Sequence, residues 1–175
     1  PGCVHTDLLA AGKIPDPFYR ANEDSVRWIP ERDWVYTRTF TVTPDILARD
    51  RVRLVCLGLD TLAKIRINGV SVGETDNMFR TWVFDVKNML RAGDNTIEIR
   101  FDSVLRHVRR KREQYGRAIA EWKGSRDERH GNLVRKEPCN FGWDWGPVLV
   151  TCGIWRDIRI EAFSTARLDE VRVGQ

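Results

Sequence analysis

The feature that most constrains the fold is a series of short segments in which apolar and polar residues alternate. Such alternation is typical of half-buried β-strands, which turn one face to a core. The expected strands cover residues 34–42, 51–59, 62–67, 70–72, 80–86, 96–101, 148–151 and 154–161. Asn68-Gly69 supplies the two positive φ angles of a type I′ turn and predicts a hairpin. Seven or more short strands with closely spaced turns predict an all-β sandwich.

The pattern changes between residues 103 and 138, which we interpret as a helix and loop inserted into the sandwich. Five apolar residues at helical spacing predict one amphipathic helix over 105–122. They are Leu105, Val108, Tyr115, Ile119 and Trp122. The insertion carries eleven Lys and Arg against five Asp and Glu, a local charge of +6 in a chain of +4. A basic helix face could bind phosphates, but such a face is usually solvated, and we predict no nucleic-acid partner.

The first thirty residues show no clean period. Pro15, Pro17 and Pro30 interrupt helices and strands. We therefore expect an extended segment that lies over the core. Its expected apolar anchors are Leu8, Leu9, Ile14, Phe18, Tyr19, Trp28 and Ile29.

Several classes of protein have no support in the sequence. No run of 18 apolar residues predicts a membrane span. Nucleotide-binding GxGxxG or P-loop motifs, the GxSxG elbow, and HxH, HExxH or CxxC spacings are all missing, so we predict neither cofactor nor metal. We expect the four cysteines to be free thiols. A Cys139–Cys152 disulfide is the leading alternative if the compartment is oxidising.

The candidate site lies in residues 139–147, which read CNFGWDWGP. Asp144 stands between Trp143 and Trp145, among glycines that let the backbone turn tightly. A carboxylate can accept hydrogen bonds from sugar hydroxyls, and indole faces can cover the apolar face of a pyranose. In the structural alternative, both tryptophans fill the core and Asp144 caps a turn.

A second candidate segment, residues 16–23, reads DPFYRANE. Its Arg20, Asn22 and Glu23 could line a polar cleft. Alternatively, Arg20 and Glu23 form a local ion pair on a loop, which stabilises little when it is exposed.

A series of motifs resembles the N-terminal domain of β-mannosidases in glycoside hydrolase family 2. They are PGCVHTDLLAAGKIPDPFYRANE, DWVYTRTF, GLDTLAKIRINGVSVGETDNMFR, FGWDWGP and GIWRDIRIE, and the resemblance extends from Pro1 to about Val173. The resemblance implies a jelly-roll, galactose-binding-like β-sandwich, with residues 1–175 as one domain of a larger chain. It further implies immunoglobulin-like domains and a (β/α)8 barrel elsewhere in that chain, and the barrel supplies both catalytic glutamates. This domain would therefore contain no catalytic residue.

The resemblance also implies roles for the candidate residues. Asp144 would hydrogen-bond hydroxyls of a terminal β-D-mannose in the −1 position, with Trp143 as a wall and Trp145 packing the loop. Arg20, Asn22 and Glu23 would brace the same region. The expected partners are the β-mannoside and the other domains of the chain. Two rival functions remain: an autonomous carbohydrate-binding module and a purely structural scaffold between domains.

Overall fold

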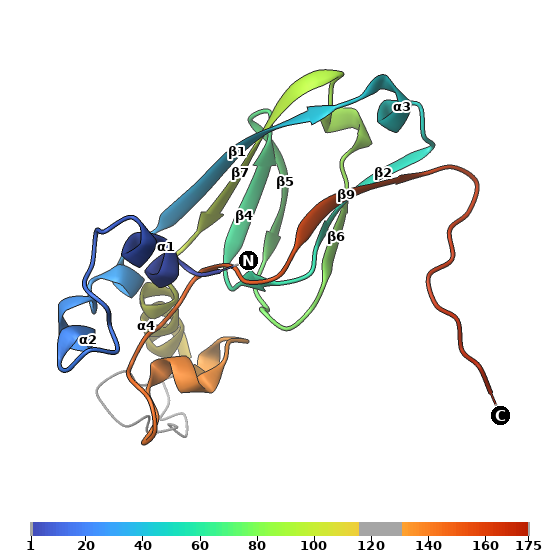
Figure 1. Ribbon diagram of the computed structural model, residues 1–175. Coiled ribbons are helices and arrows are strands. Elements are labelled where there is room, and N and C mark those ends of the chain that lie inside the picture. The colour runs from blue at the N-terminus through green and yellow to red at the C-terminus, as the bar shows by residue number, and fades with distance from the viewer. Residues whose placement is uncertain (1, 116–130, 175) are drawn as a thin grey trace.

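The computed structural model describes residues 2–115 and 131–174, and it shows a β-sandwich with most of its helices at one end, here called the helical end (Figure 1). One antiparallel sheet has the strand order β1-β7-β4-β5, and the other has the order β6-β2-β9. A short pair, β3 and β8, continues toward the helical end. The predicted all-β class is confirmed.

The strands and helices have the following bounds. The strands are β1 Trp34–Val42, β2 Arg51–Cys56, β3 Leu59–Asp60, β4 Ala63–Ile67, β5 Val70–Thr75, β6 Trp82–Asp85, β7 Gly93–Phe101, β8 Gly153–Ile154 and β9 Ile158–Phe163. The α-helices are α1 Val4–Ala10, α2 Asn22–Ser25, α3 Pro44–Leu47 and α4 Val104–Tyr115. The 3-10 helices are η1 Ile29–Glu31, η2 Lys87–Met89, η3 Gly131–Leu133 and η4 Pro138–Phe141.

The hairpin between β4 and β5 forms as its turn sequence predicts. Asn68 and Gly69 have φ angles of 52° and 80°, and Ile67 pairs with Val70. Strand β1 has the predicted bounds and pairs along its whole length with β7. Strand β7 begins at Gly93, which pairs with Val42 of β1, so it is longer at its start than the strand expected over 96–101.

Two predicted strands near the C-terminus are wrong in detail. Residues 148–151 form no strand: Val148 and Val150 are buried against α4 instead, so their alternation reflects burial without a ladder. The strand predicted over 154–161 is broken into β8 and β9. At the break the indole of Trp155 lies on Gly58, where a Cβ would come within 2.5 Å of its Nε1.

The N-terminal segment is not extended as predicted, because α1 and α2 form within it. Thr6 Oγ1 accepts a hydrogen bond from the Cys3 backbone N–H at 3.1 Å, which caps the start of α1. Ile14 and Ile29 are buried as expected, and Leu8 is partly buried. The other expected anchors are exposed, by 40–74% of their surface, namely Leu9, Phe18, Tyr19 and Trp28.

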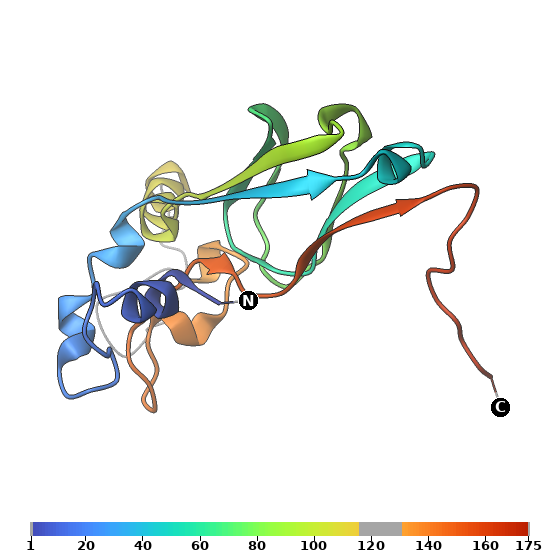
Figure 2. The same ribbon diagram turned by 45° about the horizontal axis from the view of Figure 1, so that its top comes forward.

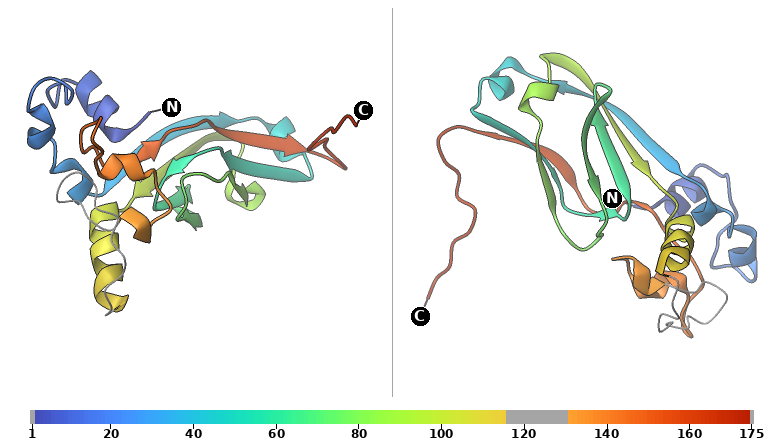
Figure 3. Two further views of the ribbon diagram at one scale, coloured as in Figure 1. Left: turned by 90° about the horizontal axis from the view of Figure 1, so that it is seen from below. Right: turned by 180° about the vertical axis from the view of Figure 1, so that it is seen from behind.

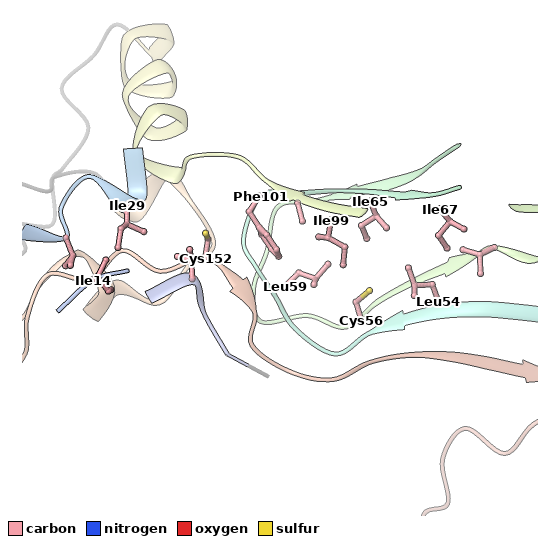
Figure 4. Packing of buried hydrophobic residues seen from close by; sticks show 14 of the residues in the cluster. Ile14, Ile29, Leu54, Cys56, Leu59, Ile65, Ile67, Ile99, Phe101 and Cys152 are labelled. Atoms are coloured by element: carbon pink, nitrogen blue, oxygen red, sulfur yellow. The ribbon is translucent and has the colours of Figure 1, made fainter. Parts of the chain in front are cut away.

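The main core lies between the two sheets and extends toward the helical end (Figure 4). Phe101 of β7 is fully buried and meets the ring of Tyr36 edge to face, with the centroids 5.7 Å apart. The Tyr36 hydroxyl donates to Asp7 Oδ2 at 2.6 Å, which ties α1 to β1. The N-terminal segment is therefore held against the sandwich at a defined place.

Helix α4 leaves the end of the sandwich, as seen from below in Figure 3. Leu105 and Val108 of this helix are buried, as expected of its apolar face. Tyr115, also expected on that face, is 59% exposed. The helix is described as far as Tyr115, so the expected positions of Ile119 and Trp122 lie outside the described residues.

Asp33 secures the start of α4. Its Oδ1 accepts from the Ser103 backbone N–H at 2.8 Å, and its carboxylate pairs with Arg100 and Arg106. Burial acts to raise the pKa of Asp33, but these hydrogen bonds outweigh it and lower the value to about 2. Part of the basic helix face is thus engaged within the domain.

Candidate functional site

A cavity of about 420 Å³ opens at the helical end, between the N-terminal segment and the loop that follows η4. It is lined by Pro17, Phe18, Arg20, Glu23, Trp143, Asp144, Trp145, Gly146, Pro147 and Val148. These two stretches of chain are far apart in the sequence and lie side by side at this end (Figure 2). Five of the six candidate residues therefore meet around one cavity, and Asn22 is not among the lining residues.

The loop carries its charge and its indoles on an exposed turn. Gly142 has a φ of 103°, a backbone conformation that is strained for any residue with a side chain. Trp143 forms an antiparallel bridge with Gly146, which closes the turn. Asp144 lies at the exposed tip, and Trp143 and Trp145 are 36% and 71% exposed. The alternative in which both tryptophans fill the core is therefore wrong.

Trp145, which we expect to pack the loop, is mostly exposed and has its ring next to that of Trp143. Its ring centroid lies 6.5 Å from that of Trp143, at an angle of 37°. Trp145 also lines a second, mainly apolar cavity of about 320 Å³, together with Pro17 and Phe18. The two cavities thus share part of their lining, and Trp145 belongs to both.

Asn22 holds the N-terminal side of the cavity in shape. Its Nδ2 donates to the Asp16 backbone oxygen at 2.9 Å, and Asp16 Oδ1 accepts from the Phe18 backbone N–H at 2.9 Å. The Arg20 backbone has a φ of 55°, and its guanidinium lies 5.1 Å from the centre of the Tyr19 ring. Arg20 and Glu23 line the cavity from the turn that these hydrogen bonds close.

The described residues that line the cavity carry charges of both signs. Among them one is a cation, Arg20, and two are carboxylates, Glu23 and Asp144. This set suits a neutral ligand with many hydroxyl groups, because carboxylates accept from hydroxyls and the guanidinium donates to them.

A buried ion pair lies at the base of the loop, and sequence analysis missed it. Lys136 Nζ contacts both carboxylate oxygens of Asp60, at 2.6 and 2.5 Å. Burial lowers the pKa of Lys136, and the charge of Asp60 acts against that shift. The signal in the sequence was Asp60 itself, a carboxylate inside the otherwise apolar stretch VCLGLDTLA, since such a group must be paired when buried.

His5 of α1 is close to this pair and is kept neutral. His5 is only 4% exposed, and its Nδ1 has no hydrogen-bond partner among the described residues. Burial first, and then the charge of Lys136, lower the pKa of His5 to about 4.

The depressed pKa makes stability depend on pH. An unfolded histidine titrates near 6.5, so between pH 6.5 and 4 the unfolded chain binds the proton more readily than the folded one. The contribution of His5 to the free energy of unfolding is fully present above pH 6.5. It is lost as the pH drops, which lowers the free energy of unfolding by up to about 3 kcal/mol at pH 4. Urea unfolding of the wild type and His5→Gln at pH 4–7 tests this. The variant should lose stability less steeply, and parallel curves would contradict the assignment.

The four cysteines, Cys3, Cys56, Cys139 and Cys152, are free thiols as expected, so the alternative Cys139–Cys152 disulfide is not formed. Burial raises the pKa of Cys56 to about 12, and burial is also the main reason that the pKa of Cys152 rises to about 12. Within residues 2–115 and 131–174, no group of three or more potential ligands could hold a metal ion. In the same part of the chain, no helix has the length and apolar character that crossing a bilayer requires.

Comparison with known proteins shows extensive similarity. Residues 1–156 match the family described as glycosyl hydrolase 2 galactose-binding domain-like. The β-mannosidase of Capra hircus is 40% identical over 176 residues, which cover 97% of this chain and 20% of that protein. β-Mannosidase B of Emericella nidulans is 41% identical over 165 residues, or 94% of this chain and 19% of that protein.

A solved structure has the same fold. The crystal structure of β-D-mannosidase from Dictyoglomus thermophilum matches with a TM-score of 0.87 and 38% sequence identity, over 97% of this chain and 20% of that one. The chain therefore spans about one fifth of the length of the relatives it matches.

Proposed function

The chain belongs to the glycosyl hydrolase 2 family of galactose-binding-like domains, and from this premise we propose that it is the non-catalytic N-terminal domain of a retaining β-mannosidase. The full-length enzyme would hydrolyse terminal non-reducing β-D-mannose residues through a glycosyl-enzyme intermediate. This domain would supply one wall of the −1 mannose site and dock on a catalytic (β/α)8 barrel.

The observation that carries the proposal is the meeting of two distant segments around one cavity. Asp144 and Trp143 reach it from the loop after η4, and Arg20 and Glu23 reach it from the N-terminal segment. Two relatives that are 40% and 41% identical to this chain over the aligned residues are named β-mannosidases, which gives the ligand class. An exposed carboxylate beside an indole face supports contact with a sugar ring.

The chemistry assigned to this domain is recognition. The Asp144 carboxylate would accept hydrogen bonds from mannose hydroxyls, and the Trp143 indole would cover the apolar face of the ring. A retaining glycosidase cleaves its bond with two carboxyl groups about 5–5.5 Å apart on either side of the scissile bond. In our proposal both belong to the barrel, and the isolated domain hydrolyses nothing.

Exposed apolar side chains around the cavity support docking. Phe18, Tyr19 and Trp145 are 74%, 58% and 71% exposed, and they gather on the rims of the two cavities or beside them. Large apolar groups that gather on a surface mark a place where another surface is bound. A barrel that covers this rim would also close the one-walled sugar site.

Asp144→Ala in the full-length enzyme tests the proposal. We expect kcat/KM on an aryl β-mannoside to fall at least about tenfold, or about 1.4 kcal/mol, because hydroxyl contacts often strengthen in the transition state. The matched control is Asp45→Ala, an exposed aspartate of α3 at the other end of the sandwich. Both variants should melt within a few degrees of wild type.

Other results would favour the rival functions. An unchanged kcat/KM in Asp144→Ala would leave the domain a structural scaffold. Saturable binding of mannan by the isolated domain, lost in Asp144→Ala, would make it an autonomous binding module. We expect weak or no binding, since one open wall buries too little of a ligand.

A further inference from the structure

Asp60 joins the two ends of the loop that carries the candidate sugar contacts. It lies in β3, pairs there with Gly153, and is 2% exposed. Lys136 binds its carboxylate from the chain before the loop, and Thr151 Oγ1 donates to its Oδ2 at 2.7 Å from the chain after the loop. Both ends of the segment 136–151 are therefore tied to one carboxylate on a strand of the sandwich.

The contacts between the ends complete a closed polar cluster. Lys136 Nζ also donates to Thr151 Oγ1 at 3.0 Å, and the same hydroxyl lies 2.9 Å from Asn140 Oδ1. Thr61 Oγ1 donates to Asp60 Oδ1 at 2.5 Å. The side chains of Lys136 and Asp60 are 0% and 3% exposed, so water does not loosen these bonds. We call Asp60, Lys136 and Thr151 the loop clamp.

The exposed turn that carries the candidate sugar contacts lies between these two tied ends. Between the clamped ends, Phe141, Val148 and Val150 are buried in the cluster beneath α4, while Trp143, Asp144 and Trp145 are exposed. Apolar packing keeps a segment in place but tolerates small shifts, whereas directional, charge-assisted hydrogen bonds fix its register. A contact that acts in a transition state requires placement within about 0.5 Å.

A stability role alone is a poor explanation of a buried ion pair. Taking both charges out of water costs about as much as their attraction returns, and an apolar pair of similar volume is often as stable or more so. We propose that the loop clamp is a positioning device, in which Asp60, Lys136 and Thr151 set the place of the Asp144 carboxylate against the sugar. This inference rests on the proposed function of Asp144.

The test uses the full-length enzyme and a variant that removes the clamp without leaving a buried charge. Asp60→Val combined with Lys136→Met keeps the site apolar and filled. We expect kcat/KM on an aryl β-mannoside to fall roughly tenfold, mainly through kcat, as in Asp144→Ala. Added to Asp144→Ala, the clamp substitutions should change kcat/KM no further, since they act through the same carboxylate. Lys64→Met, which removes a half-exposed lysine from its pair with Asp102, is the matched control and should retain full activity.

Thr151 provides a milder pair of variants in case the double substitution does not fold. Thr151→Val keeps the shape and removes the hydroxyl, and we expect a loss of roughly fivefold in kcat/KM, again absent in the Asp144→Ala background. Thr151→Ser restores the hydroxyl and should restore kcat/KM, which a role in packing alone does not predict.

The outcomes separate this inference from the proposed function. If Asp144→Ala lowers kcat/KM but the clamp variants keep wild-type values, the clamp inference is wrong and the sugar wall stands. If the two losses simply add, the clamp does not act through Asp144 and the inference is likewise overturned. An unchanged kcat/KM in Asp144→Ala would overturn both the clamp inference and the proposed role of Asp144 in the sugar site.

Discussion

Replacement of Asp60 with alanine is expected to lower the free energy of unfolding of the domain by about 3–5 kcal/mol. The substitution leaves Lys136 with a 0% exposed side chain and without its carboxylate partner. A buried ammonium group must then lose its proton or draw water into the core, and either change favours the unfolded state. Urea unfolding at pH 7, followed by tryptophan fluorescence, measures the loss.

Two companion variants make this result specific. Asp24→Ala removes an aspartate from an exposed pair with Arg27, at 3.0 Å, and should change stability by less than about 1 kcal/mol. Adding Lys136→Met to Asp60→Ala removes the stranded charge and should recover most of the loss. An Asp60→Ala variant as stable as Asp24→Ala would show that the pair is not buried as described.

Phe101→Ala is the second large expected effect, again about 3–5 kcal/mol. Phe101 is 0% exposed and pairs across the sheet with both Trp34 of β1 and Ala63 of β4. Its ring fills the core between the sheets next to Leu59 (Figure 4). Removing the ring leaves a cavity where the main core meets the helical end, and neighbours on paired strands cannot move to fill it.

The matched control is Phe79→Ala, since Phe79 is 54% exposed. That variant should stay within about 1 kcal/mol of wild type. Comparable urea midpoints for the two phenylalanine variants would contradict the core assignment, because the substitution is the same and only the burial differs.

Most strands of the sandwich could be predicted, because the alternation of apolar and polar residues is a local property of the sequence. In β1 and β4 each strand shows its own alternation, and the Asn68-Gly69 turn states its own geometry. The failures came where burial and hydrogen bonding are set by distant segments. Val148 and Val150 alternate like a strand but pack beneath α4. Two helices form within the first thirty residues. The prolines there led us to expect an extended segment, and the cap that Thr6 provides for α1 was not recognised.

The candidate site was predictable in its parts and not in its assembly. A carboxylate between two tryptophans is unusual enough to select Asp144, and the resemblance paired it with the segment around Arg20. No local pattern reveals that Asp60 receives Lys136 and Thr151 from opposite ends of a loop. Partners separated by 76 and 91 residues become visible only in the folded chain.

The central claim is that this domain forms a wall of the mannose site, and the most direct measurement is the crystal structure of the full-length enzyme with a mannose-configured inhibitor. We predict an Asp144 carboxylate oxygen at roughly 2.5–3.0 Å from a hydroxyl of the sugar in the −1 position, with the Trp143 ring beside it. A sugar bound in the barrel with Asp144 beyond hydrogen-bonding reach, and no water between them, would contradict the account.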